Sequence, residues 1–193
     1  VGSEMCIRDS NKIKLIFCDE AHNPAGEIVP YYSSFNTSKK VQNQIKWKDE
    51  AKDIVWQQIV KHKIHNQAML LKKLDIKGYE KLLEYEESVE VGDTTNREGH
   101  AAKVYFNLLF GKKFIRGMND SINSGLDYGY SILLSTINKE VASKGYITQI
   151  GINHKSEFNQ FNLTCDLMEP FRPLIDEIVY NSTNSEFDKK QKY

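Results

Sequence analysis

The stretch T-N-R-E-G-H-A-A-K-V-Y-F, residues 95–106, places a carboxylate on the apolar face of an expected helix. At helical spacing Glu98 shares a face with small and apolar residues, namely Ala101, Ala102, Tyr105, Leu108 and Leu109. A charge on such a core-facing stripe is costly unless it is paired or binds a cation. Glu98 therefore has two interpretations. It completes a capping box with Thr95 at the start of the helix, or it is a ligand for a cation.

A second motif, G-I-N-H-K at residues 151–155, precedes a segment with helical periodicity at residues 158–179. That periodicity predicts a helix with a buried apolar stripe of Leu163, Leu167, Phe171, Leu174 and Ile178. Pro170 predicts a kink, because proline removes a backbone donor inside a helix. Asp166 and Glu169 share another face of the same segment.

His154 and these two carboxylates together make a candidate site for a hard metal ion, built from separate segments. Taken singly, each has a plainer interpretation. His154 is then a loop histidine with satisfied hydrogen bonds, and Asp166 and Glu169 are a solvated helix face.

Three motifs in a fixed order make the chain resemble the CRISPR-associated adaptation endonuclease and integrase family, Cas-one, and most closely its type II branch. The motifs are R-E-G-H-A-A-K-V-Y-F from residue 97, G-I-N-H from residue 151 and D-L-M-E-P-F-R-P from residue 166. Shorter similar segments lie at residues 16–20, 30–32, 43–47, 81–85 and 92–100. The resemblance extends over residues 11–180.

The resemblance implies a metal centre with Glu98, His154 and Glu169 as catalytic ligands and Asp166 in a supporting position. The implied cation is Mg²⁺ or Mn²⁺, and an imidazole ligand favours Mn²⁺ more than a pure oxygen site does. The implied reaction is transesterification, in which a DNA 3′-hydroxyl attacks a phosphodiester and inserts new spacer DNA into a CRISPR array, in antiviral adaptive immunity. Water as the nucleophile would give endonuclease activity at the same centre.

Three basic residues near these motifs, Arg97, Lys103 and Arg172, are candidates for contacts to DNA phosphates. Arg172 has an alternative, an ion pair with Asp176 four residues further along the helix. The family also implies double-stranded and splayed DNA as substrates, a homodimer, and a small second Cas subunit that bridges the dimers.

The chain departs from the family at its start. Residues 1–10 match no family segment and begin without Met, so we expect a non-native artefact there. We expect residues 11–35 to be the remnant of an N-terminal β domain and its linker, with the last strand at residues 13–19 and a tight turn at residues 22–27. Residues 36–193 are then the α-helical metal-binding catalytic domain. The expected fold class is mainly α: a helical catalytic domain preceded by the last strand of a mostly missing N-terminal β domain, in a fragment of a longer gene product.

Periodicity and capping residues predict further helices at residues 37–47, 48–74, 78–89 and 120–143, and a short strand at residues 146–152. The helix of Glu98 should end at Gly111, a common C-cap residue. In the longest helix we expect a buried stripe of Ile54, Val55, Ile59, Ile64, Ala68 and Leu71.

Composition narrows the class of protein only slightly. The 26 basic and 26 acidic side chains give a formal net charge of zero, which argues against a uniformly basic DNA-binding surface. Residues 39–77 are nevertheless rich in lysine and residues 84–90 are acidic, and a lysine-rich helix face is either simply solvated or a contact for phosphates. No apolar run could span a membrane and the three cysteines lack disulfide or zinc spacing, so we expect a cytoplasmic protein with no membrane partner.

Three functional hypotheses remain at this point. The first is a metal-dependent DNA endonuclease and integrase. The second is a non-catalytic helical scaffold that binds DNA or a partner, with carboxylates that only make ion pairs. The third is an unrelated metallohydrolase, which the order and context of the three motifs disfavour.

Overall fold

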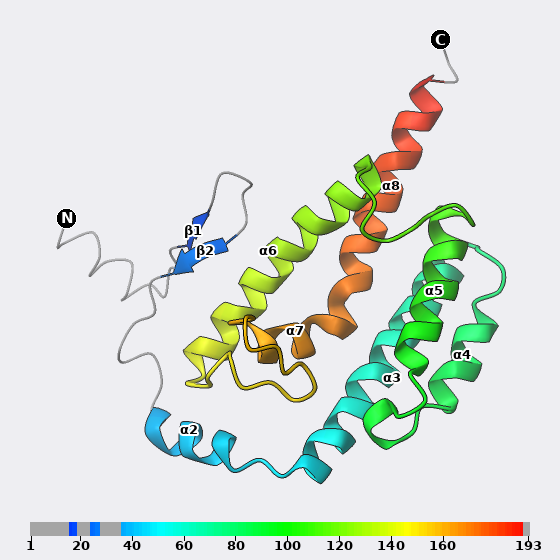
Figure 1. Ribbon diagram of the computed structural model, residues 1–193. Coiled ribbons are helices and arrows are strands. Elements are labelled where there is room, and N and C mark those ends of the chain that lie inside the picture. Colours follow the sequence, from blue (N-terminus) through cyan, green and yellow to red (C-terminus); the bar gives the residue numbers. More distant parts are fainter. Residues whose placement is uncertain (1–15, 19–23, 28–35, 191–193) are drawn as a thin grey trace.

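The computed structural model describes residues 16–18, 24–27 and 36–190, and they are mostly helical (Figure 1). The helices are α2 (Thr37–Ile45), α3 (Asp49–Lys73), α4 (Glu80–Glu87), α5 (Arg97–Phe110), α6 (Ser121–Ser143), α7 (Asn162–Met168) and α8 (Arg172–Lys190). Two short 3₁₀ turns are η1 (Val91–Asp93) and η2 (Glu169–Phe171). Strands β1 (Ile16–Cys18) and β2 (Pro24–Glu27) pair in an antiparallel sheet. The mainly α fold class expected from the sequence is confirmed.

The N-terminal expectations fall partly outside the described residues, as does the expected artefact at residues 1–10. The described part of the expected strand forms β1. The tight turn expected at residues 22–27 is wrong for its last four residues, because Pro24–Glu27 is a strand. Pro24 stands at the first position of that strand, where its missing N–H breaks no ladder of hydrogen bonds.

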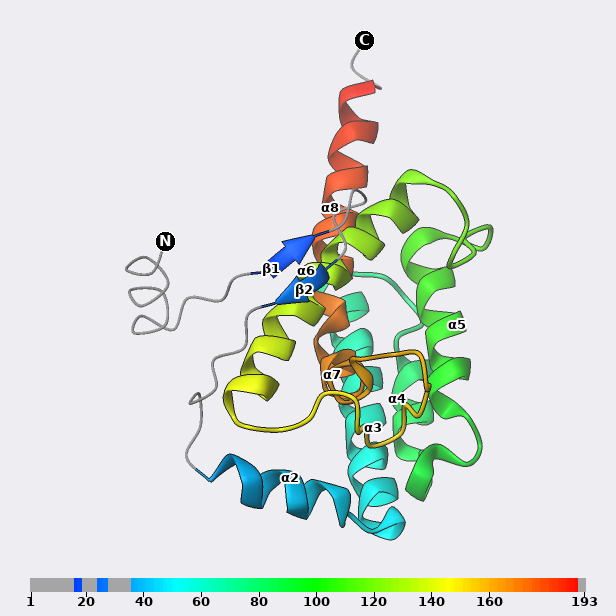
Figure 2. The same cartoon turned by 60° about the vertical axis from the view of Figure 1, so that its left-hand side comes forward.

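Helix α3 is the centre of the helical fold (Figure 2), and it packs against α4, α5, α7, α8 and both 3₁₀ turns. Its buried apolar face carries Trp56, Ile59, Val60, Ile64, Ala68, Leu70 and Leu71. The expected stripe is therefore confirmed from Ile59 onward. It is wrong for Ile54 and Val55, which are 54% and 45% exposed, because Trp56 takes the inward position at that end of the helix.

Helices α6 and α8 approach closely because α6 has glycines at the crossing. Gly125 faces Val179, and a Cβ atom on Gly129 would overlap the side chain of Ile175. A second, smaller core forms around this crossing, with Leu126, Tyr130, Met168 and Val179 buried in it. This contact fixes α8, and α8 follows directly from the turn that carries Glu169.

The helix expected at residues 158–179 is broken into α7, η2 and α8, with the break beside Pro170. A kink there was expected, but its consequence for packing was not. Beyond the break the buried face changes, so Phe171, Leu174 and Ile178 are 49%, 59% and 62% exposed, against the prediction. The change of direction at the proline turns a different face of α8 toward α6.

The strand expected at residues 146–152 is wrong, because this segment is a loop of turns. The side chain of Gln44, on α2, replaces a partner strand. Its Nε2 donates to the carbonyls of Ile147 and Ile150 at 2.7 and 2.9 Å, and its Oε1 accepts from the Ile147 N–H at 2.8 Å. One amide thus satisfies backbone groups that a sheet would otherwise pair.

Candidate functional site

Glu98 lies in the first turn of α5, but it does not cap the helix. Asn96, in a left-handed conformation at φ 52°, accepts the Gly99 N–H through its side chain. Asp93 accepts the N–H groups of Arg97 and Glu98 at 2.7 and 3.0 Å. The first turn is therefore satisfied by Asp93 and Asn96, and the capping-box interpretation of Glu98 with Thr95 is wrong.

The carboxylate of Glu98 instead meets a lysine from the centre of α3. Lys63 Nζ donates to Glu98 Oε1 at 2.6 Å and lies 2.5 Å from Glu169 Oε2. Burial alone would lower the pKa of Lys63, but Glu169 and Glu98 together raise it above its usual value. The two carboxylates predicted to be metal ligands therefore contact the same ammonium group.

Lys63 was not singled out from the sequence, because it lies within the lysine-rich residues 39–77. The overlooked signal is its position. Lys63 stands four residues after Ile59 and four before Gln67, and all three are buried on the same face of α3.

Glu169 is only 3% exposed and stands in η2, immediately before Pro170. Arg172 Nε donates to its Oε1 at 2.9 Å. Burial alone would raise the pKa of Glu169, but the charges of Lys63 and Arg172 outweigh burial and hold it below its usual value. Oε2 lies close to the Lys63 ammonium, yet it receives no well-aligned hydrogen bond from any described residue.

Asp166, on α7, is fully buried and organises the loop that carries His154. Its Oδ2 accepts the N–H groups of Ile152 and Asn153 at 2.5 and 3.1 Å. Its Oδ1 accepts the N–H of His154 at 3.0 Å and lies 2.6 Å from the ring Nδ1 of the same residue. With Nδ1–H donated to Asp166, the Nε2 lone pair of His154 is available to a cation.

His154 is half-buried against the edge of Trp56, with ring centroids 5.9 Å apart. Its hydrogen bond to Asp166 raises its pKa above the usual value, although burial opposes this. A cation at Nε2 would require the neutral imidazole ring, so protonation of His154 would compete with metal binding there.

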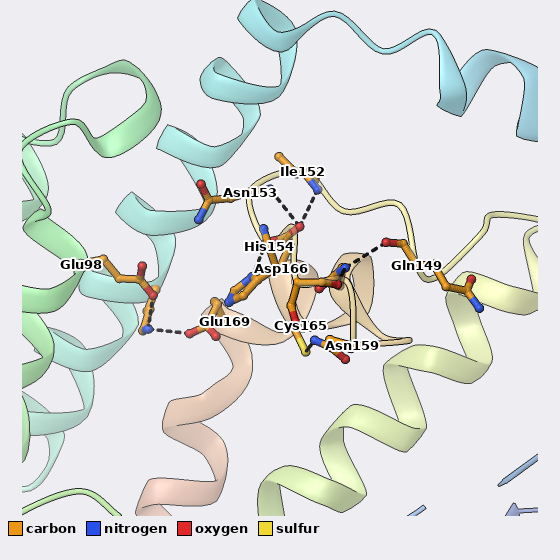
Figure 3. A network of polar contacts seen from close by, with 12 residues as sticks. Glu98, Gln149, Ile152, Asn153, His154, Asn159, Cys165, Asp166 and Glu169 are labelled. Atoms are coloured by element: carbon orange, nitrogen blue, oxygen red, sulfur yellow. Dashed lines mark hydrogen bonds and ion pairs between the residues drawn. The ribbon is translucent and has the colours of Figure 1, made fainter. Parts of the chain in front are cut away.

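Figure 3 shows how the site residues are arranged: Glu98 on one side, Glu169 across the Lys63 contacts, and His154 with Asp166 beside Glu169. Asp166 and Glu169 are both buried, so neither belongs to a solvated face. Within the described residues, no three His, Cys, Asp or Glu side chains stand in a metal-ligating arrangement. Glu98 and Glu169 thus both contact the ammonium of Lys63. His154 lies beside them and is held by the carboxylate of Asp166.

The three candidates for phosphate contacts have different surroundings. The Arg97 guanidinium lies 5.8 Å from the ring centroid of Tyr85. Lys103 is exposed on α5. Arg172 is bonded to Glu169 and stacks 4.5 Å from the ring centroid of Tyr130, so the hydrogen bond found for it is not the expected pair with Asp176.

A cavity of ≈ 410 Å³ opens beside His154, between α3 and the loop that precedes α7. Its lining includes two lysines, Lys52 and Lys155, together with Gly151 and Asn162. The carboxylate of Glu157 also lines the cavity, so its charge is mixed.

A second buried carboxylate lies further along α8. Asp176 is fully buried and accepts hydrogen bonds from the hydroxyls of Tyr105 and Tyr130, at 2.8 and 2.5 Å. Burial raises the pKa of Asp176 to about 6, although hydrogen bonds from the two tyrosines lower it in part. Burial, reinforced by the neighbouring Asp176, also raises the pKa of both tyrosine hydroxyls.

Fold and site together define a class of protein: a helical domain that gathers two carboxylates and a carboxylate-oriented histidine from three separate segments. Comparison with known proteins identifies the family. The chain belongs to the family of the CRISPR associated protein Cas1, whose family model matches residues 5–193. The expectation that residues 1–10 match no family segment is therefore wrong for residues 5–10.

A curated relative is the CRISPR-associated endonuclease Cas1 of Neisseria meningitidis serogroup C (strain 8013). It is 37% identical over 167 residues, which are 86% of this chain and 55% of the relative. The resemblance expected from the motifs is confirmed, including its type II branch. The chain spans about half the length of this relative.

Two solved structures share the fold. One is a chain of a partial Cas6-RT-Cas1–Cas2 complex, 25% identical with a TM-score of 0.70 over 91% of this chain and 59% of that chain. The other is a casposase bound to integration product, 20% identical with a TM-score of 0.79 over 96% of this chain and 58% of that chain. None of the described helices is long and apolar enough to cross a membrane.

Proposed function

We propose that this chain carries the catalytic centre of a metal-dependent DNA endonuclease and integrase that inserts spacer DNA into a CRISPR array. The observation that carries the proposal is that Glu98 and Glu169 both contact the ammonium of Lys63, beside a histidine that Asp166 orients. Membership of the Cas1 family and the relative named as an endonuclease support it.

The donor atoms of these side chains are of the types that a hard divalent cation such as Mg²⁺ or Mn²⁺ prefers, although no three such side chains of the described residues stand in a metal-ligating arrangement. Glu169 Oε2 is a buried carboxylate oxygen without a well-aligned donor, and Glu98 and His154 add an oxygen and an imidazole nitrogen. Oxygen ligands with one imidazole suit Mg²⁺ and Mn²⁺. When bound, such a cation polarises the scissile phosphate and stabilises charge on the entering or leaving oxygen.

Neighbouring side chains hold the candidate metal ligands in position. Arg172 fixes Glu169, and Asp166 fixes both the ring of His154 and its backbone N–H. Lys52 and Lys155, two lysines that line the cavity, are candidates to contact phosphates of a DNA strand beside His154. With Arg97 and Lys103 they supply local positive charge to a chain whose net charge is zero.

In the proposed reaction a DNA 3′-hydroxyl attacks a phosphorus atom of the repeat. A new P–O bond forms, the bond to the leaving 3′-oxygen breaks, and the proton of the attacking hydroxyl is lost while the leaving oxygen gains one. The number of phosphodiester bonds is unchanged. Water as the attacking group turns the same step into strand cleavage.

The proposed substrates are double-stranded and splayed DNA. The proposed partners are a second copy of the chain and a small second Cas subunit, and the proposed location is the cytoplasm. Among proteins of similar fold, one is part of a Cas1–Cas2 complex and another is bound to an integration product, which supports the DNA and Cas2 parts of this proposal.

One observation favours the alternative of a non-catalytic scaffold. Lys63 and Arg172 already neutralise Glu98 and Glu169, as they would if the carboxylates only made ion pairs. The alternative makes a different prediction for substitutions. A structural ion pair matters for folding, whereas a ligand matters for chemistry in a protein that remains folded.

The test is the Glu98→Gln variant of the full-length protein. We expect strand transfer into a repeat-bearing duplex to be lost while the helical circular dichroism is retained. Glu84→Gln is the matched control, because Glu84 also pairs with a lysine, Lys81, at 2.5 Å but on the exposed surface. If activity instead follows the fraction of folded Glu98→Gln protein, the scaffold is the better account.

A further inference from the structure

Lys63 is unusual because it brings a charged side chain into the interior at the proposed metal site. Its side chain is 10% exposed, and its ammonium contacts Glu98 at 2.6 Å and Glu169 at 2.5 Å. Lysine is rarely this buried unless it is paired. Here it stands between the two carboxylates that the proposed function assigns to a divalent cation.

The ion pairs made directly by Glu98 and Glu169 are already balanced. Glu98 and Glu169 contribute two negative charges, and Lys63 and Arg172 contribute two positive charges. A divalent cation added to these four groups would leave two excess positive charges, of which the nearby buried carboxylate of Asp166 would offset one. Like charges at such close range repel strongly where water is scarce.

One of the two resident cations is better placed to leave than the other. The Arg172 guanidinium is bonded to Glu169 Oε1 and stacked on Tyr130, so two different contacts hold it. The ammonium of Lys63 ends a flexible stem, and its two contacts are to the carboxylate atoms that a metal would take. Its contact with Glu169 Oε2 also lacks hydrogen-bond alignment.

We propose that Lys63 is an internal counter-ion that competes with the divalent cation for Glu98 and Glu169 and thereby sets the metal affinity of the site. This inference rests on the proposed function, because it presupposes that the site binds a metal. Binding then exchanges one cation for another: the ammonium leaves both carboxylates as the metal arrives. The carboxylates remain paired throughout, which protects the fold from the repulsion between them.

The test measures Mn²⁺ affinity and not catalysis. Lys63→Met keeps an unbranched side chain of similar length and removes the charge. In full-length protein, titrated with Mn²⁺ and followed by electron paramagnetic resonance of the free ion, we expect this variant to bind Mn²⁺ at least about tenfold more tightly than wild type. Lys63→Arg, which keeps the charge, should not bind more tightly than wild type.

Lys61→Met is the matched control, since it removes a lysine from the same helix two positions away, on another face. Its Mn²⁺ affinity should equal that of wild type. Thermal melts give an independent readout. Lys63→Met should melt below wild type in the presence of a chelator and gain more than wild type from added Mn²⁺, because the metal then supplies the only positive charge shared by both carboxylates.

Equal or weaker Mn²⁺ binding by folded Lys63→Met would overturn the inference. If that variant fails to fold even with Mn²⁺, Lys63→Gln, whose amide still donates to a carboxylate, is subject to the same criterion. Failure of the proposed function is distinguishable. In that case wild type and Lys63→Met would bind Mn²⁺ no better than Glu98→Gln does.

Discussion

Glu169 and Asp176 are both buried carboxylates on the same stretch of chain, yet their surroundings make them different chemical groups. The pKa of Glu169 lies below its usual value because Lys63 and Arg172 outweigh the effect of burial. The pKa of Asp176 is raised by burial to about 6, because its partners are the neutral hydroxyls of two tyrosines. Burial alone therefore does not fix the pKa of a carboxylate, because the charge of its partners can reverse the shift.

Arg172 lies between these two environments. It bonds to Glu169 and stacks over Tyr130, whose hydroxyl donates to Asp176. The tyrosine pair and Asp176 therefore form a hydrogen-bonded support behind the charged site. The comparison leads us to propose a catalytic role for Glu169 and a supporting role for Asp176, and three experiments test this difference.

The largest expected difference is in activity. Glu169→Gln should lower strand transfer by at least about a hundredfold, because it removes a charge that the proposed cation needs. Asp176→Asn should keep most of the activity, since its amide still hydrogen-bonds the tyrosine hydroxyls. Integration assays on both variants at matched folded concentration test the comparison. Equal losses in the two variants would erase the distinction between the carboxylates.

The next expected difference is in the pH dependence of stability. The pKa of Asp176 in the folded chain, about 6, is above that of an unfolded aspartate, about 3.9. Its stabilising contribution is therefore fully present below pH ~4 and is lost as the pH rises through ~6. Relative to Asp176→Asn, the free energy of unfolding of wild type should fall by roughly 2–3 kcal/mol between pH 4 and 7.

Urea unfolding at several pH values measures this free energy. The difference between wild type and Asp176→Asn isolates the one carboxyl from all others that titrate in the same range. A difference that stays constant from pH 4 to 7 would mean that Asp176 is ionised throughout, and that the two environments are more alike than their partners indicate.

The smallest expected effect is at the residue that joins the two environments. Arg172→Lys keeps the positive charge but loses the planar fork and most of the stacking on Tyr130. We expect a loss of about 1 kcal/mol in the free energy of unfolding. Because Glu169 would be held less firmly, Mn²⁺ binding should weaken by roughly tenfold. Unchanged Mn²⁺ binding would show that Glu169 does not depend on Arg172 for its position.

The sequence predicted the helical class and most helix positions, because helical periodicity and caps are local signals. Glu98, His154, Asp166 and Glu169 could be proposed as site residues because each lies in a short motif. Lys63 was hidden, since one lysine among many looks solvated until its face of α3 is known to be buried.

The errors share a physical cause, which is contact over long sequence distances. Residues 146–152 have the composition of a strand, but their backbone groups are taken by Gln44, about a hundred residues earlier. The exposed side of α8 was mistaken for its core side, because only the crossing with α6 decides which face is covered. No local pattern carries either fact.

The bonds from Asp166 to the backbone of Ile152, Asn153 and His154 also determine how this segment opens. Releasing the loop alone would leave a fully buried carboxylate without its donors, so we expect the loop and α7 to open as one cooperative unit. Amide hydrogens of an irregular segment would then exchange with solvent as slowly as those of a helix. His154 would thus lie in a segment that is irregular in backbone shape but as stable against local opening as a helix.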